Sequence, residues 1–174
     1  VSTSQLLELA RDTRAEAVVS AKDFKQLPDT AERMAKTVRD LRLVFREENV
    51  RLSAAQIDER PAFAPALVTV LDALRELASV LETQAARSEG LEKCWQRALD
   101  LVARIERWKD GDKKQAEQAD RAPCAEVYTQ ALSLNATPLS VADIFRRQME
   151  DNPRAWIFTS ATLAVGGDFG HYCG

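Results

Sequence analysis

The sequence has 174 residues, of which 45% are hydrophobic and 29% charged, and its formal net charge is −3. This composition is typical of a globular chain of one domain or slightly more, and the acidic balance argues against a dedicated DNA-binding domain, which is usually basic. No apolar run approaches the length that spans a bilayer, and the first residues lack the apolar core of a secretory signal. We therefore expect a cytoplasmic protein without a membrane partner.

The first part of the chain carries two helix patterns. Ser2-x-x-Gln5 is a capping box, which predicts a helix over residues 3–19. A second helix is predicted to begin at Pro28-Asp29, with Asp29 as its N-cap. Its apolar residues recur at alternating spacings of four and three, the heptad pattern of a helix that packs along another helix. They are Leu27, Ala31, Met34, Val38, Leu41 and Phe45.

The heptad pattern returns after an irregular segment that contains one capped turn, Ser53-Ala54-Ala55-Gln56. Because its phase never slips, we favour one helix over residues 62–108, about 70 Å long at 1.5 Å per residue. A break at Ser88-Glu89-Gly90 stays open, since the pattern turns polar there and Gly disfavours a helix by about 1 kcal/mol. The pattern runs through Phe63, Leu67, Val70, Leu74, Leu77, Leu81, Gln84, Ser88, Leu91, Trp95, Ala98, Val102 and Ile105.

Beyond this pattern the chain changes character. Residues 110–114 are expected to end the helix, and residues 115–122 to form an exposed loop. From 127 to 136 apolar and β-branched residues alternate with polar ones, which predicts a strand pair or hairpin. Ser140 is expected to cap a short helix. Trp156-Ile157-Phe158 predicts a strand buried on both faces. We expect residues 154–160 to be ordered as this strand.

The end of that strand holds the most informative residues. Thr159-Ser160-Ala161-Thr162-Leu163 places hydroxyl groups at the carboxyl end of a buried strand, where open α/β sheets bind ligands. This string resembles the Ser-Ala-Thr motif of superfamily-two helicases, in the form used by the DinG/XPD-type DNA helicases. Residues 139–145, Leu-Ser-Val-Ala-Asp-Ile-Phe, resemble the segment that precedes the motif in that family. Such a short string is a hypothesis that its context must support.

The resemblance implies a domain organisation. In DinG/XPD-type helicases a helical arch is inserted between the Asp-Glu-Ala-His motif and the Ser-Ala-Thr motif, and it helps to enclose single-stranded DNA. Residues 1–121 then correspond to the arch, and residues 122–174 to part of a RecA-like motor domain. The expected fold is mainly α, an elongated antiparallel helical arch with a small C-terminal α/β piece. Because the chain begins at Val1 rather than Met, we expect a segment of a longer protein.

The expected function is that of the arch in an ATP-dependent 5′-to-3′ DNA helicase that acts in DNA repair or replication. The resemblance implies that Ser160 and Thr162 couple the nucleotide state to the grip on DNA. The alternative from another class is a helical interaction module whose heptad pattern binds a partner protein's helix.

Cofactors are expected in the longer protein rather than in this chain. The sequence has neither a Gly-x-x-x-x-Gly-Lys-Ser/Thr loop nor Asp-Glu-Ala-His, so this chain alone is not expected to be an ATPase. The resemblance implies that the longer protein binds ATP, magnesium and an iron–sulfur cluster. Cys94, Cys124 and Cys173 are widely spaced, which favours ordinary reduced thiols over a metal site, and the single His171 has no partner His.

Two groups of cations are candidates for contact with DNA. Four of them recur at near-helical spacing on the face expected to lie opposite the apolar residues, and three lie beside the pattern of the second helix. Such stripes can follow a phosphate backbone. The alternative, that these cations only form a solvated helix face, stays open, since acidic residues interrupt both stripes and no aromatic residue interleaves with them. The candidates are Lys93, Arg97, Arg104 and Arg107, and Arg39, Arg42 and Arg46.

Overall fold

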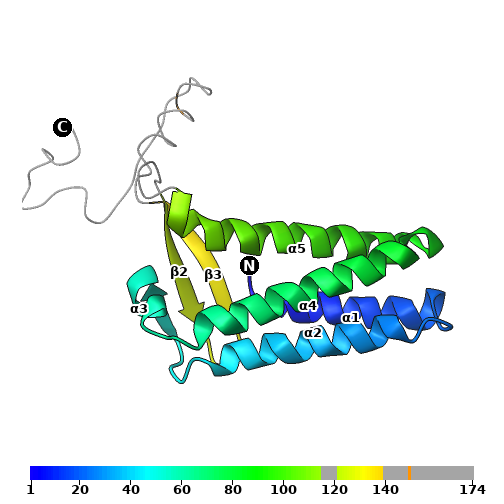
Figure 1. The fold of residues 1–174 in the computed structure, drawn as a ribbon, viewed down its shortest axis with the longest axis horizontal. Helices are drawn as coiled ribbons and strands as arrows, with labels where there is room; N and C mark the ends of the chain where they lie inside the picture. Colours follow the sequence, from blue (N-terminus) through cyan, green and yellow to red (C-terminus); the bar gives the residue numbers. More distant parts are fainter. Residues whose placement is uncertain (115–120, 139–148, 150–174) are drawn as a thin grey trace, which may run out of the picture. The chain divides into compact units, whose positions relative to one another are not determined.

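The computed structural model describes residues 1–114, 121–138 and 149. The chain divides into two units, residues 1–139 and residues 140–174. The first unit contains four long helices, α1 (Thr3–Ser20), α2 (Gln26–Leu43), α4 (Phe63–Gln84) and α5 (Glu89–Lys114), in an up-down-up-down antiparallel bundle (Figure 1). A short helix and a small antiparallel sheet complete it. The predicted mainly-α class with antiparallel helices is therefore confirmed.

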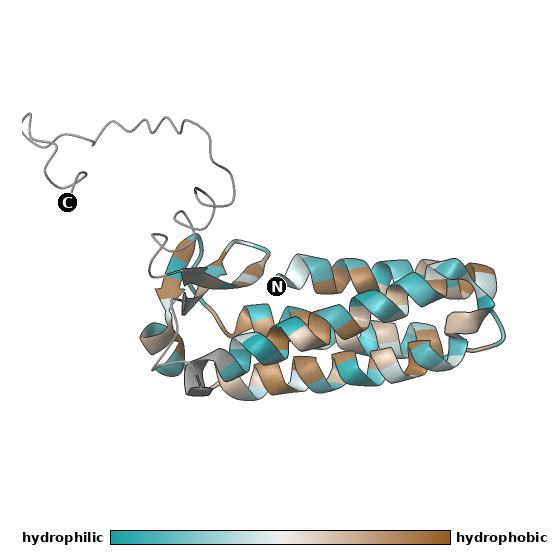
Figure 2. Cartoon of the chain, turned by 90° about the horizontal axis from the view of Figure 1, so that it is seen from above, coloured by the Kyte–Doolittle hydropathy of each residue, from teal (hydrophilic) through white to brown (hydrophobic). Residues whose placement is uncertain are grey.

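Each long helix touches two others. α2 packs on α1 and α4, and α5 packs on α4 and α1, so the bundle is closed. Hydrophobic and hydrophilic residues alternate around the helices in Figure 2, as expected for helices that bury one side. All six predicted apolar positions of α2 are buried: Leu27, Ala31, Met34, Val38, Leu41 and Phe45.

A local signal sets the start of α1 but not that of α2. The Ser2–Gln5 capping box begins α1 as predicted. The prediction of Asp29 as N-cap of the second helix is wrong, because α2 begins at Gln26 and Asp29 lies in its first turn. The fully buried Leu27 explains the early start, since its side chain belongs to the buried side of the helix. An acidic residue in the first turn still favours the positive end of the helix dipole.

The prediction of one continuous helix over residues 62–108 is wrong. The alternative, a break at Ser88-Glu89-Gly90, is present. A 3₁₀ turn, η1 (Ala85–Arg87), follows α4, and Ser88 is extended, with φ −159° and ψ 153°. The Ser88 hydroxyl oxygen accepts from the Leu91 amide at 3.1 Å and so caps α5. α5 also continues to Lys114, through the residues expected to end it.

The buried side of α5 is shifted slightly from the predicted pattern. Cys94 and Leu101 are buried there, whereas the predicted Trp95 and Val102 are only partly buried. The other buried positions match the prediction: Leu91, Ala98 and Ile105. Only one of the two alternating heptad positions therefore continues from α4 into α5, through Leu91, Ala98 and Ile105, and its continuity across the reversal of chain direction is a coincidence of the turn.

The sheet has the strand order β1-β2-β3, with β1 (Val50–Ser53), β2 (Arg121–Val127) and β3 (Leu132–Pro138) all antiparallel. The predicted hairpin is confirmed, but its turn comes earlier than expected. Tyr128 was predicted in a strand, and its amide instead donates to the carbonyl of Ala131 at 2.8 Å, across the turn. β1 was not predicted. One face of the sheet joins the hydrophobic core through Leu52, Ala125, Val127, Leu132 and Leu134.

The segment between α2 and α4 holds β1 and the short helix α3 (Ala54–Asp58). Asn49 precedes β1 with φ 55°, a left-handed conformation that Asn tolerates better than most residues. The predicted capped turn is confirmed, because Ser53 and Gln56 form a capping box at the start of α3.

Several predictions lie outside the described residues: the short helix after Ser140, the strand over 154–160 and the motif Thr159–Leu163. The assignment of residues 1–121 and 122–174 to two helicase domains stays a prediction. Among the described helices, none has the length and apolar character needed to cross a membrane.

Candidate nucleic-acid interface

Six of the seven candidate cations lie on two helices that are not neighbours. Arg39 and Arg42 belong to α2, Arg46 follows it, and the other four belong to α5. Since α2 and α5 each pack between α1 and α4, they occupy diagonal positions in the bundle. The two stripes therefore do not form one continuous surface, and each has to be judged separately.

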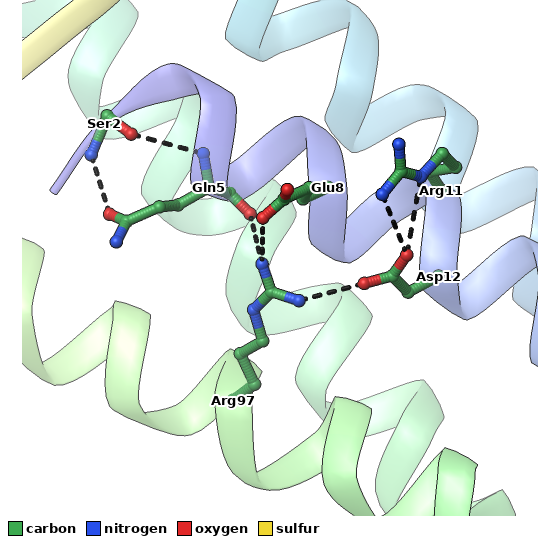
Figure 3. A network of polar contacts seen from close by, with 6 residues as sticks. All are labelled: Ser2, Gln5, Glu8, Arg11, Asp12 and Arg97. Carbon is green, nitrogen blue, oxygen red and sulfur yellow. Dashed lines mark hydrogen bonds and ion pairs between the residues drawn. The ribbon is translucent and has the colours of Figure 1, made fainter.

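Arg97 lies between α5 and α1. Its guanidinium donates to Asp12 Oδ2 and Glu8 Oε2, both at 2.9 Å, and to the Gln5 carbonyl at 3.3 Å (Figure 3). Its side chain is 36% exposed. The expectation that Arg97 lies on the face opposite the core is therefore wrong, because two acidic side chains of α1 draw it into a helix–helix contact.

Three further candidates are paired with carboxylates. Lys93 contacts Glu89 one turn away at 2.5 Å, which raises the pKa of Lys93 and lowers the pKa of Glu89. Arg104 pairs with Asp100 at 3.4 Å, also one turn away. Arg39 pairs with Glu32 at 3.4 Å. These exposed pairs are weak, but each must compete with a phosphate for its cation.

Arg42, Arg46 and Arg107 form no ion pair within the described part of the chain. Arg42 donates to four backbone carbonyls, those of Phe45 and Tyr128 at 2.8 Å, Thr129 at 3.2 Å and Glu47 at 3.4 Å. These acceptors are neutral, so the positive charge of Arg42 is held in place without being cancelled. Arg107 donates to the Ala103 carbonyl of its own helix at 3.3 Å.

Tyr128 is the residue that sequence reasoning missed. It is 47% exposed at the β2–β3 turn, and its carbonyl accepts from Arg42, although 86 residues separate the two. Its hydroxyl donates to Glu126 Oε2 at 2.9 Å, and this bond raises the pKa of Tyr128. The stripe of α2 therefore does have an aromatic neighbour, which only the folded chain brings to it. The predicted hairpin was the one sequence signal that placed Tyr128 near a turn.

An apolar groove lies at the same end of the bundle as the sheet. It has a volume of about 320 Å³ and is lined by α3, the start of α4, the end of α5 and Pro123 of β2. Phe63 and Trp108 meet edge to face in its wall, with ring centroids 6.0 Å apart, and the Trp108 indole donates to the Asn135 carbonyl at 3.0 Å. The groove has the size and polarity to hold an apolar side chain of another protein.

The described residues do not offer a metal site. They contain no group of three or more His, Cys, Asp or Glu side chains that could hold an ion. Cys94 on α5 and Cys124 on β2 are both buried; burial raises the pKa of the Cys94 thiol, and the Cys124 sulfur accepts from the Arg51 guanidinium at 3.4 Å. The described part of the chain therefore does not fit an iron–sulfur cluster, which needs about four thiolate ligands.

Two curated proteins resemble this chain along nearly its whole length. The ATP-dependent DNA helicase YoaA of Escherichia coli is 33% identical over 99% of this chain, and the protein of the same name from Haemophilus influenzae is 29% identical over 99%. The chain is homologous to a segment of a DNA helicase. It spans about a quarter, 26%, of the length of each of these YoaA relatives. The resemblance to a DinG/XPD-type helicase is thereby confirmed. No family model and no solved structure matches the chain.

Proposed function

We propose that this chain provides the helical arch of an ATP-dependent DNA helicase of DinG/XPD type, where it helps to enclose single-stranded DNA during 5′-to-3′ unwinding. The work of such a helicase would be DNA repair or replication in the cytoplasm. Two observations support the proposal: the similarity to YoaA over 99% of the chain, and the pairing of residues 1 and 2 with β3 in the helical unit.

The first residues pair with the last strand of the helical unit, and this observation carries the proposal. The Val1 carbonyl accepts from the Leu134 amide at 2.7 Å, and the Val1 amino group donates to the Leu134 carbonyl at 2.8 Å. Ser2 forms an antiparallel bridge with Ser133. Residues 1 and 2 therefore lie beside β3 as a neighbouring antiparallel strand. Domains whose ends lie together are the kind that can be inserted into another domain.

In this proposal the cofactors of the complete helicase bind outside the arch. ATP, magnesium and an iron–sulfur cluster would bind to other parts of the complete helicase, since the described residues offer no metal-binding group. Thr159, Ser160, Ala161, Thr162 and Leu163 would act as the coupling motif between the ATPase site and DNA, as their resemblance to the Ser-Ala-Thr motif implies. In this arrangement the arch itself does no ATP chemistry.

A protein partner on the arch is a second candidate. The heptad residues cannot bind a partner helix as first envisaged, because most are buried among the chain's own helices. The apolar groove beside Trp108 is the observation that favours a partner, through an apolar side chain inserted there.

Replacement of the arch in the complete helicase tests the main proposal. The predicted arch, residues 1–121, would be exchanged together with the hairpin β2–β3 that belongs to the same unit. A short Gly-Ser linker in place of residues 1–138 can close the gap because Val1 and Leu134 are neighbours. ATP binding should persist, since the ATPase motifs lie outside this chain, while processive unwinding should be lost. A replacement variant that unwinds DNA as far and as fast as the intact helicase would contradict the proposal.

A further inference from the structure

We propose that the β2–β3 turn is a contact point for single-stranded DNA, where Tyr128 stacks on a base and Arg42 and Arg46 face the phosphates. This inference rests on the proposed function and gives it a location. It differs from both stripes expected from the sequence, since it joins one end of α2 to a turn in the second half of the chain.

The positive charges of Arg42 and Arg46 favour a contact with phosphates at this turn. The guanidinium of Arg42 touches only neutral carbonyl oxygens, and Arg46 has no carboxylate partner among the described residues. Binding of a phosphate near these residues would break no ion pair, in contrast to Arg39 and Arg97. Release of counterions from the DNA then favours the contact without an internal competitor.

The exposed aromatic ring of Tyr128 favours stacking on a base. Tyr128 is 47% exposed and is held at several points: its amide bonds to Ala131, its carbonyl to Arg42 and its hydroxyl to Glu126. A ring that is already fixed loses little conformational freedom on binding. Stacking on aromatic side chains is the usual way in which proteins hold single strands without reading sequence.

The acidic groups at this end of the bundle are largely engaged. Glu47 pairs with Arg60. Glu126 accepts from Tyr128 and, at 3.0 Å, from the Asn135 amide. Glu48 is exposed and has no ion-pair partner among the described residues. Asp40 of α2 is likewise exposed and unpaired within the described part of the chain, so the inference rests on the position of Arg42 and Arg46 beside Tyr128 and not on an excess of positive charge.

Photo-crosslinking in the complete helicase tests the location directly. The probe is an oligothymidine strand in which single bases are replaced by 5-iodouracil, and the crosslinked peptides are identified by mass spectrometry. A crosslink on the peptide that contains Tyr128 is expected. Crosslinks elsewhere within residues 1–138, but none at this turn, would overturn the inference and leave the proposed function standing. No crosslink anywhere within residues 1–138 would count against both.

Binding of the 174-residue chain to fluorescent oligothymidine at low salt provides the second measurement. Tyr128→Ala should weaken binding by about fivefold or more, whereas Tyr128→Phe, which keeps the ring, should stay within about twofold. Arg46→Gln should weaken binding and lower the salt slope by about one. Arg39→Gln is the matched control on α2, because Arg39 is already paired with Glu32. Equal affinity of the Ala and Phe variants, or no binding at all, would overturn the inference.

Discussion

Arg97 and Arg42 carry the same guanidinium group, and the fold uses them in opposite ways. Arg97 forms ion pairs with two carboxylates, Glu8 and Asp12, and these pairs join α5 to α1. Arg42 faces only carbonyl oxygens, so its charge remains available to an anion. Their positions in the sequence predicted that both lie on helices, but not which groups lie opposite them, because those partners come from distant segments.

Arg97→Ala should lower the free energy of unfolding by about 1 kcal/mol, because it removes hydrogen bonds to two half-exposed carboxylates and one carbonyl. Urea denaturation of the 174-residue chain measures this. Arg11→Ala is the control, since Arg11 is 74% exposed and contacts only its neighbour Asp12; it should cost under about 0.5 kcal/mol. Equal stability of the two variants would mean that Arg97 does not join the helices.

At the scale of elements, an arginine–carboxylate pair crosses every helix contact in the bundle. Arg14–Glu32 joins α1 to α2 at 2.7 Å, and Arg33–Glu76 joins α2 to α4 at 2.7 Å. Arg75–Glu106 joins α4 to α5 at 2.5 Å, and the Arg97 pairs join α5 to α1. Each exposed pair adds little stability, but opposite charges at fixed positions favour one helix order and register over others.

Sequence patterns predicted the elements well where the signal was local. The Ser2 and Ser53 capping boxes and the heptad residues of α2 are present as predicted, because caps and buried stripes depend on neighbouring residues. β1 was missed, since four residues, Val50–Ser53, become a strand only by pairing with residues 124–127. The helix break was not favoured, because two packed helices can keep one heptad phase through a turn. The turn contact of Tyr128 with Arg42 had no local signal.

Ser88→Ala tests the break between α4 and α5. Loss of the hydroxyl that caps the Leu91 amide should cost about 1 kcal/mol in the free energy of unfolding. Ser79→Ala is the matched control, because Ser79 is exposed within α4 and Ala favours a helix interior slightly. A Ser88→Ala variant as stable as the control in thermal or urea unfolding would indicate a continuous helix through residue 88.

At the scale of the whole molecule, one sheet brings together distant parts of the chain. Residues 1 and 2 lie beside β3, so the first residues of the chain join this sheet. The Arg42–Tyr128 contact belongs to the same sheet, through the β2–β3 turn. The proposed DNA contact therefore lies at the turn end of the sheet that the first residues join.

Retention on circular single-stranded DNA tests the central claim, enclosure of the strand, most directly. The complete helicase would be loaded on a circle and on a linear strand of the same length, and its dissociation followed with ATP and excess competitor. Because an enclosed circle has no end to slide from, release from the circle should be at least about tenfold slower, and exchange of residues 1–138 for a linker should remove the difference. Equal release from circle and linear strand by the intact helicase would contradict enclosure by the arch.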